Sequence, residues 1–444
     1  MGWPPPSARL GTLAAAALLL HLLFVVSLPT KWLHPLFVEA VEGHGQASDF
    51  FGIYQAGENL ANGFSIYDSD DYRNEAPRVV PFFYFYRYLP PTAYGAALAA
   101  VILPPWPAYW IWVALNEILM GLLVLSVLRD GRWPAARRWI IASVWLAFTP
   151  FHIEQIMGQF SLTMAAFLWV LWRCEREDDQ ERGLPRRRFD PVLAAWVASL
   201  SLKSFSAPMA LPYLRDGKRR RVLFGGLLTV LLSLPYFVWR PGDIWEFLRL
   251  NLSPFGPRIL KGSLGFQTLL RDLLSRTGIG SPEATLEILG RSVSWSRLAM
   301  AAAALGILLL ALRGTWMNRS CRDASRRRAV DLLIWTGAFF LMFKSVWEYH
   351  YVMMLPAATA AYLTSGSRTV LAAAVLLALP TLYAAAPVLA GVPSSADLSL
   401  WPGWLRGLHF STKPLPALAL FLWGCREAGR LPTGGLGRPR PPRG

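Results

Sequence analysis

The apolar run LGTLAAAALLLHLLFVVSL occupies residues 10–28 and contains no Asp, Glu, Lys or Arg. A transmembrane helix needs about 20 consecutive apolar residues, so this run is long enough to cross a bilayer. No small-x-small cleavage pattern precedes Lys31, which favours a retained anchor over a signal peptide. The run therefore indicates a membrane protein.

The composition of the whole chain agrees with this interpretation. Of its 444 residues, 54% are hydrophobic and 16% are charged, whereas soluble proteins carry about 25% charged residues. The net charge of +16 comes from short Arg clusters between apolar runs, which is the pattern of cytoplasmic loops. No basic face with interleaved aromatic residues is visible, so nucleic acid is excluded as a partner and membrane lipids are expected.

About twelve apolar segments alternate with these basic clusters. They cover residues 8–28, 106–128, 138–153, 160–174, 189–202, 204–214, 222–239, 295–313, 328–345, 350–364, 368–391 and 414–426. With every Arg cluster in the cytoplasm, the chain is predicted to be an all-α, multi-pass protein of the inner (plasma) membrane with both termini inside. Segment 88–103 is short and bounded by prolines, so we expect a short or re-entrant helix packed against protein. A full crossing there would make thirteen.

This topology predicts one transmembrane domain over residues 1–426. Two large loops, residues 29–87 and 240–294, are placed on the outer face, and juxtamembrane helices are expected in the first. Residues 427–444 are rich in Gly, Pro and Arg, which is typical of a disordered basic tail on the cytoplasmic side.

A carboxylate stands in the first outer loop, within the sequence SDFFGIYQAG of residues 48–57. From Asp49 to Leu60 the pattern predicts an amphipathic helix that stops at Asn62-Gly63. Asp49 would then lie where membrane meets water, a place that suits a general base acting on a substrate held at the bilayer surface. The alternative is that Asp49 only caps this helix.

Other polar residues stand at the ends of apolar segments. Lys203 separates two short apolar segments, where an ionisable residue marks a candidate functional site and could hold a phosphate, unless it snorkels to the interface. Gln159 opens an apolar segment and could hydrogen-bond a sugar, although helix capping explains it as well. Glu348 and His350 lie between two apolar segments, where each must be hydrated or paired, and His350 could polarise a hydroxyl or contact a phosphate.

Two basic residues and an acidic turn lie in the outer loops. Arg258 and Lys261 could neutralise a phosphate, and a solvated loop is the alternative. The acidic turn of Asp68, Asp70 and Asp71 matches no calcium loop, and no Cys or His spacing fits a structural metal. No cofactor or metal is therefore expected, and a divalent cation at the acidic turn stays open.

Five pieces of the sequence, taken together, resemble glycosyltransferase family 87. Its members are polytopic proteins of the GT-C fold and are similar to mannosyltransferases that use polyprenyl-phosphate mannose. In chain order the pieces are Asp49 to Asp68, Gly158-Gln159, Leu202-Lys203 with Pro208, Ser263-Leu264-Gly265 with Gln267, and Trp347 to His350.

The resemblance implies a GT-C-like bundle and an inverting transfer on the outer face. A hexose, expected to be mannose, would pass from a polyprenyl-phosphate donor to a lipid or glycan acceptor. Asp49 would be the general base and His350 would assist near the donor phosphate. The positions expected to bind donor or acceptor are Tyr54, Gln159, Lys203, Arg258, Lys261 and Glu348. The family usually has Asn-Gln-Ser at residues 261–263 and often Trp-Asp-His-His at 347–350, and these differences leave the donor and the role of Glu348 open.

The chemistry of the residues fits such a transfer. A sugar on a lipid phosphate already carries a good leaving group, so one carboxylate and a few cations suffice, whereas a glycoside hydrolase normally needs two opposed carboxylates. Two alternatives stay open. A transporter or flippase of lipid-linked sugar would need polar residues at mid-bilayer depth, where Asn116-Glu117 is the main exception to a pattern of charges at helix ends. The chain could also be a non-catalytic scaffold.

Overall fold

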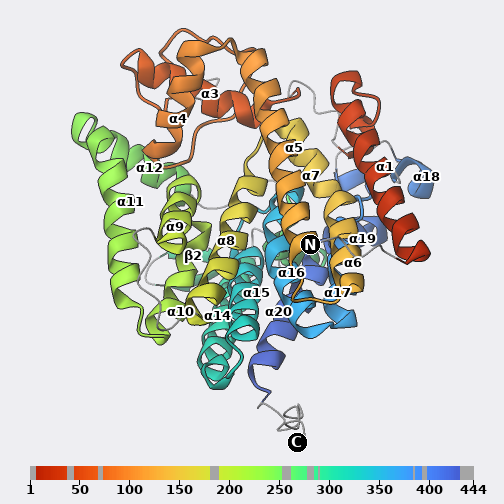
Figure 1. Cartoon of the computed structure of the whole chain (residues 1–444). Coiled ribbons are helices and arrows are strands. Elements are labelled where there is room, and N and C mark those ends of the chain that lie inside the picture. The colour runs from red at the N-terminus through yellow and green to blue at the C-terminus, as the bar shows by residue number, and fades with distance from the viewer. Residues whose placement is uncertain are drawn as a thin grey trace, which may run out of the picture.

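The computed structural model describes residues 7–37, 45–68, 74–180, 190–252, 262–277, 285–288, 291–383, 386–392 and 398–430. Helices dominate this part of the chain, which confirms the predicted all-α class (Figure 1). One short antiparallel pair, β1–β2, is an element that the sequence analysis did not predict.

The elements follow one another along the chain as α1 (Ala8–Thr30), α2 (His34–Phe37), α3 (Ser48–Ala61), α4 (Pro90–Ile102), α5 (Pro105–Arg129), α6 (Ala135–Leu146), α7 (Thr149–Met157), α8 (Ser161–Gln180), α9 (Pro191–Leu202), η1 (Ser204–Met209), α10 (Ala210–Arg215), α11 (Arg219–Trp239), α12 (Asp243–Leu252), α13 (Phe266–Arg276), β1 (Thr285–Ile288), β2 (Arg291–Ser294), α14 (Trp295–Met317), η2 (Asn318–Ser320), α15 (Ala324–Met342), η3 (Glu348–Met354), α16 (Leu355–Ser365), α17 (Arg368–Ala378), α18 (Ala386–Ala390), η4 (Leu398–Leu400), α19 (Gly403–Ser411) and α20 (Pro414–Ala428). Here η denotes a 3₁₀ helix.

Five helical stretches among the described residues are long and apolar enough to cross a membrane. They are Ala8–Thr30, Pro105–Arg129, Ala135–Met157, Arg219–Trp239 and Trp295–Ser320. The predicted count of twelve or thirteen crossings is not confirmed. Several predicted segments are shorter or interrupted in the structure, such as α9 with 12 residues and α17 with 11. At 1.5 Å per residue such helices cover about half of a hydrocarbon core roughly 30 Å thick.

Segment 88–103 forms α4, which packs along α3. Figure 1 shows both helices at the top of the view, at the end opposite α10 and α14. Gly57 permits the close approach, because a Cβ there would lie 2.4 Å from the carbonyl carbon of Ala96. The Tyr54 hydroxyl donates a hydrogen bond to the carbonyl oxygen of Leu103 at 2.7 Å and ties α3 to the end of α4. The helix expected in the first large loop is therefore held firmly against its neighbour.

The core lies around α15, which packs against α8, α14, α16 and α20. Every residue from Arg328 to Ala338 is buried, although the stretch begins with a charged group. Buried charges are tolerated only when they are paired, so the charged groups of this stretch need partners on neighbouring helices.

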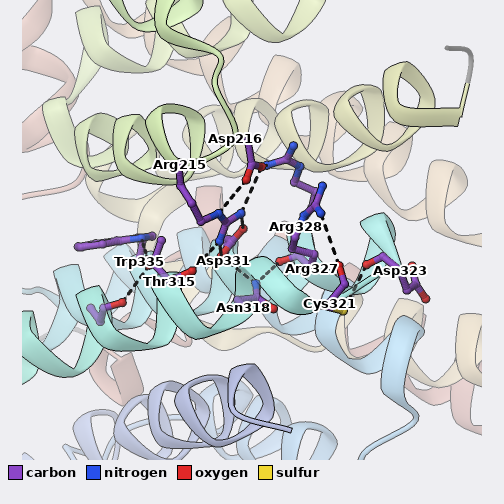
Figure 2. Close-up of polar contacts among 11 residues, drawn as sticks. Arg215, Asp216, Thr315, Asn318, Cys321, Asp323, Arg327, Arg328, Asp331 and Trp335 are labelled. Atoms are coloured by element: carbon purple, nitrogen blue, oxygen red, sulfur yellow. Dashed lines mark hydrogen bonds and ion pairs between the residues drawn. The ribbon is translucent and has the colours of Figure 1, made fainter. Parts of the chain in front are cut away.

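Those partners form a network of ion pairs and hydrogen bonds that joins α10, α14 and α15 (Figure 2). Arg215 on α10 donates to the Thr315 carbonyl on α14 at 2.8 Å. Arg215 contacts Asp331 at 2.7 Å and its neighbour Asp216 at 2.7 Å. Arg328 pairs with Asp216, and Asn318 donates to Asp331 at 2.8 Å. Asp331 is fully buried. The network therefore lies inside the bundle, at the end away from α3, and holds the helices together there.

Replacing Asp331 with Ala removes the buried carboxylate on which Arg215 and Asn318 converge. We expect a loss of about 3–5 kcal/mol in the free energy of unfolding, since one partner of a buried pair is left uncompensated. Thermal unfolding in detergent would measure it. The matched control is Asp323→Ala at the exposed start of α15, where the carboxylate accepts a hydrogen bond from the Arg326 N–H. Loss of such a cap costs about 1 kcal/mol, and equal losses in the two variants would contradict the prediction.

Candidate active site

The start of α3 fixes the position of Asp49. Ala47, the residue before the helix, is buried and has a left-handed backbone with φ of 71°, and its N–H donates to the carbonyl oxygen of Ile156 at 2.7 Å. At the next residue, the Ser48 carbonyl accepts a hydrogen bond from the Tyr84 N–H at 3.3 Å. Ala47 is the N-cap and no side chain caps the helix. The interpretation of Asp49 as the cap is therefore wrong, and its carboxylate lies in the first turn.

The turn between α7 and α8 brings Gln159 to the same place. Gly158 ends α7 with φ of +72°, a conformation that favours glycine. A Cβ at this position would lie 2.4 Å from the Cβ of Phe50, so α3 presses directly on the turn. The Trp112 indole N–H donates to the Gln159 carbonyl at 3.1 Å, which fixes the backbone of the turn from α5.

Lys203 lies between α9 and η1, as the pair of short apolar segments predicts. Its Nζ is 3.2 Å from Oε1 of Gln159 and 3.2 Å from Nε2 of His350. The rings of Phe160 and Tyr88 flank the amine, with centroids 5.0 and 5.7 Å from Nζ. Three sequence pieces that are far apart along the chain thus meet at one lysine.

His350 belongs to η3, and its ring is fixed from the other side. The Trp347 N–H donates to Nδ1 at 3.1 Å. The segment before η3 pairs with the residues just before α13, where the Leu264 N–H donates to the Val346 carbonyl at 2.7 Å and Ser263 bridges to Trp347. This pairing explains why the Ser263-Leu264-Gly265 piece belongs with the late motif.

Burial dominates the electrostatics of the site. It raises the pKa of Asp49, while polar interactions with Gln159, the charge of Lys203 and Tyr349 partly offset the rise. Burial lowers the pKa of Lys203 to about 8, although the charges of Asp49 and Glu154 act in the opposite direction. Burial and the Lys203 charge hold the pKa of His350 well below its usual range. Of the three groups, Lys203 is the one whose pKa of about 8 lets it exchange a proton close to neutral pH.

Four residues near this site are not among the predicted site residues. Glu154 is fully buried, and its Oε1 accepts a hydrogen bond from the Leu162 N–H at 2.7 Å. Tyr88 contacts Gln159 through its hydroxyl at 3.4 Å. Tyr349 and Arg87 interact with the Asp49 carboxylate. Tyr88 and Arg87 lie in an aromatic run before α4, and no local pattern in that run distinguishes them.

Two carboxylate oxygens at the site, Oδ2 of Asp49 and Oε2 of Glu154, are buried without a hydrogen-bond partner among the described residues. Buried polar atoms are normally satisfied, and an exception points to a functional role or a missing ligand. Each of these oxygens is able to accept a proton. Within the described ranges, no group of three or more His, Cys, Asp or Glu residues could hold a metal ion.

The remaining predicted site residues lie elsewhere. The Tyr54 hydroxyl points to the end of α4. Glu348 is buried and pairs with Lys413 at 3.1 Å, while the same Nζ donates to the Leu377 carbonyl at 2.8 Å. Neither Tyr54 nor Glu348 joins the Lys203 cluster, and their contacts with substrate stay predictions. Arg258 and Lys261, like Asp70 and Asp71, lie outside the described residues.

Residues 86–345 match the profile of glycosyltransferase family 87, which is more than half of the chain. The chain belongs to glycosyltransferase family 87. The resemblance seen in the sequence is confirmed, and together with the membrane-spanning helices it makes the protein a multi-pass membrane glycosyltransferase. The match includes Gln159 and Lys203, whereas Asp49 and His350 lie outside it, so their roles in this family 87 protein depend on the geometry of the site.

Gly158 offers a test of how the glycosyltransferase site is held together. Gly158→Ala should lower both stability and transfer activity, because the new Cβ strains a left-handed residue and also collides with Phe50. Gly63→Ala is the matched control, since Gly63 has φ of +81° and a Cβ added there would meet no atom within 4 Å. We expect about 1–3 kcal/mol from backbone strain in both variants and a further loss only at Gly158. Equal activity in the two variants would show that the contact with Phe50 does not position the site.

Proposed function

We propose that this family 87 protein transfers a hexose, most simply mannose, from a polyprenyl-phosphate sugar to a lipid or glycan acceptor at the outer face of the inner (plasma) membrane. Asp49 acts as the general base on the acceptor hydroxyl. The observation that supports this most directly is the meeting of Asp49, Gln159, Lys203 and His350, which come from four separate parts of the chain.

The chemistry of the site suits a donor that brings its own leaving group. A carboxylate with a raised pKa is a stronger base than an exposed one and can take the acceptor proton as the new bond forms. Lys203 and Arg87 act on that carboxylate by their charges, and His350 contacts Lys203. All three groups are able to stabilise negative charge on the departing phosphate. An inverting displacement needs no second carboxylate on the opposite face of the sugar.

The transporter alternative is weakened by the contacts of Glu117. This intramembrane carboxylate on α5 accepts from Nε2 of His21 on α1 at 2.8 Å, and His21 Nδ1 lies 3.1 Å from the Leu146 carbonyl. Glu117 thus joins α1 to α5, as polar residues between membrane helices commonly do. This contact gives Glu117, the main charge at mid-bilayer depth, a structural role. No path for a transported substrate is needed to explain it.

Asp49→Asn in purified protein should lower kcat for transfer from a polyprenyl-phosphate sugar by about 100-fold or more, because an amide cannot accept the hydroxyl proton. The measurement is formation of the glycosylated acceptor across several polyprenyl-phosphate sugars, with and without chelator. Asp49→Ala should behave alike.

The control for Asp49→Asn is Glu58→Gln, which changes an acid on the same helix whose carboxylate accepts from Asn62 at 3.2 Å. This variant should keep wild-type turnover. Wild-type turnover in Asp49→Asn would end the assignment of the base, and uptake of labelled lipid-linked sugar into vesicles without covalent transfer would favour the transporter.

A further inference from the structure

The two ring nitrogens of His350 place a constraint on Lys203. Nδ1 accepts a hydrogen bond from the Trp347 N–H at 3.1 Å, so it carries no proton. A neutral imidazole has one N–H, which must then be on Nε2. Nε2 lies 3.2 Å from Nζ of Lys203. A protonated lysine has only donors, so Nε2–H and an ammonium group would face each other as two donors.

The contact becomes a hydrogen bond when the lysine is neutral, because the amine lone pair then accepts from Nε2–H. Nζ still donates to Oε1 of Gln159 at 3.2 Å in that state. The surroundings favour loss of the proton, since burial lowers the pKa of Lys203 to about 8. Geometry and burial therefore agree on a lysine that is readily deprotonated.

We propose that Lys203 enters the reaction as a neutral amine and takes over from Asp49 the proton of the acceptor hydroxyl. The inference rests on the proposed glycosyl transfer and assigns Lys203 a role beyond that of a fixed positive charge. Gln159 connects the two groups, because it contacts Nζ and interacts with the Asp49 carboxylate.

The charged and titratable groups that face Lys203 come from several elements. Asp49 on α3 and Glu154 on α7 are the anions, and both favour its charged form. His350 on η3 and Tyr88 before α4 are the neutral groups beside the amine. With two carboxylates nearby, the amine needs only a small change in its surroundings to gain a proton.

The step balances. The acceptor oxygen bonds to the anomeric carbon and its O–H bond breaks, with the proton going to Asp49. The bond between the anomeric carbon and the phosphate oxygen breaks, and its electron pair stays on the phosphate, which gains one negative charge. The proton then passes from Asp49 to Nζ of Lys203. The site thus gains a positive charge as the leaving group gains a negative one, which is the condition for electrostatic stabilisation in a buried site.

A neutral lysine and a fixed cation predict opposite pH profiles. If Lys203 must accept a proton, kcat/KM rises with pH up to the pKa of about 8 and then levels off. If Lys203 only holds the donor phosphate as a cation, kcat/KM falls as pH rises through the same value. Both cases predict a loss of rate at low pH, where Asp49 becomes protonated. The change in rate near pH 8 therefore decides between them.

Lys203→Arg is the critical variant because an arginine remains charged at every working pH. We expect a kcat about 100-fold lower, a donor KM within about threefold of wild type, and no inflection near pH 8. Lys203→Met should lose both kcat and donor affinity. A Lys203→Arg enzyme with wild-type kcat, or a wild-type kcat/KM that falls above pH 8, would overturn the inference.

A second readout is independent of turnover. Reductive methylation with formaldehyde and a cyanoborohydride reductant modifies neutral amines, and mass spectrometry can follow its pH dependence at Lys203 against exposed Lys31. Lys203 should become reactive at a lower pH than Lys31, and Glu154→Gln should move that pH lower still, because a neighbouring anion that stabilises the ammonium is lost.

The two proposals fail in different ways. Transfer by an enzyme whose Lys203 reacts at the same pH as Lys31 would overturn this inference alone. A wild-type protein that transfers no sugar from any polyprenyl-phosphate donor would overturn the proposed function, and with it the path of the proton.

Discussion

The rest of the site depends on one partly buried amine, Lys203, which lies beside the imidazole of His350. Removing a charged amine from water is costly, and neighbours must compensate for it or the group gives up its proton. The compensation comes from Asp49, Glu154 and Gln159, which lie on α3, on α7 and in the turn after α7, whereas Nε2–H of His350 on η3 favours the neutral amine. Because α3, α7 and η3 are far apart along the chain, the fold must fix each of them separately.

The fold fixes them through backbone contacts that leave little freedom. Ala47 adopts a left-handed conformation although it has a side chain, and the hydrogen bond from its N–H to Ile156 holds α3 against α7. Gly158 adopts the same backbone region without strain because it has no side chain, and α3 fills the volume where a Cβ would stand. Strained residues persist only where the surrounding structure determines them, and they gather at functional sites. Each of the two lies within two residues of a group that contacts or faces Lys203, namely Asp49 and Gln159.

Much of the helical arrangement follows from the sequence, because long apolar runs between Arg clusters can hardly form anything else in a membrane. Lys203 stands out in the sequence as well, since a lysine between two short apolar segments is costly to bury. Gln159 and His350 stand out mainly as pieces of a family pattern. Their contact with Lys203 depends on how distant helices pack, which no local signal encodes.

Other features are beyond prediction for physical reasons. Glu154 looks in the sequence like one more polar residue at a helix end, and only packing shows that it is buried beside Lys203. Glu348 stands two residues before His350 but pairs with Lys413 at the start of α20. One reason why the number of membrane crossings is not confirmed is that apolar segments such as 350–364 begin as 3₁₀ turns. The hydropathy of a segment does not distinguish a 3₁₀ turn from an α-helix.

The buried carboxylates at the two ends of the molecule have different environments. Those at one end stabilise the fold, and we propose that those at the other end take part in the reaction. In the network of α10, α14 and α15, Asp331 accepts hydrogen bonds from Arg215 and Asn318 at ordinary distances, so both of its oxygens have partners. Around Lys203, Asp49 and Glu154 each keep one buried oxygen that no described residue satisfies. A carboxylate whose oxygens all have partners stabilises the fold. An unsatisfied carboxylate oxygen is able to take the proton of an incoming hydroxyl, and we therefore propose that the reaction takes place at that end of the bundle.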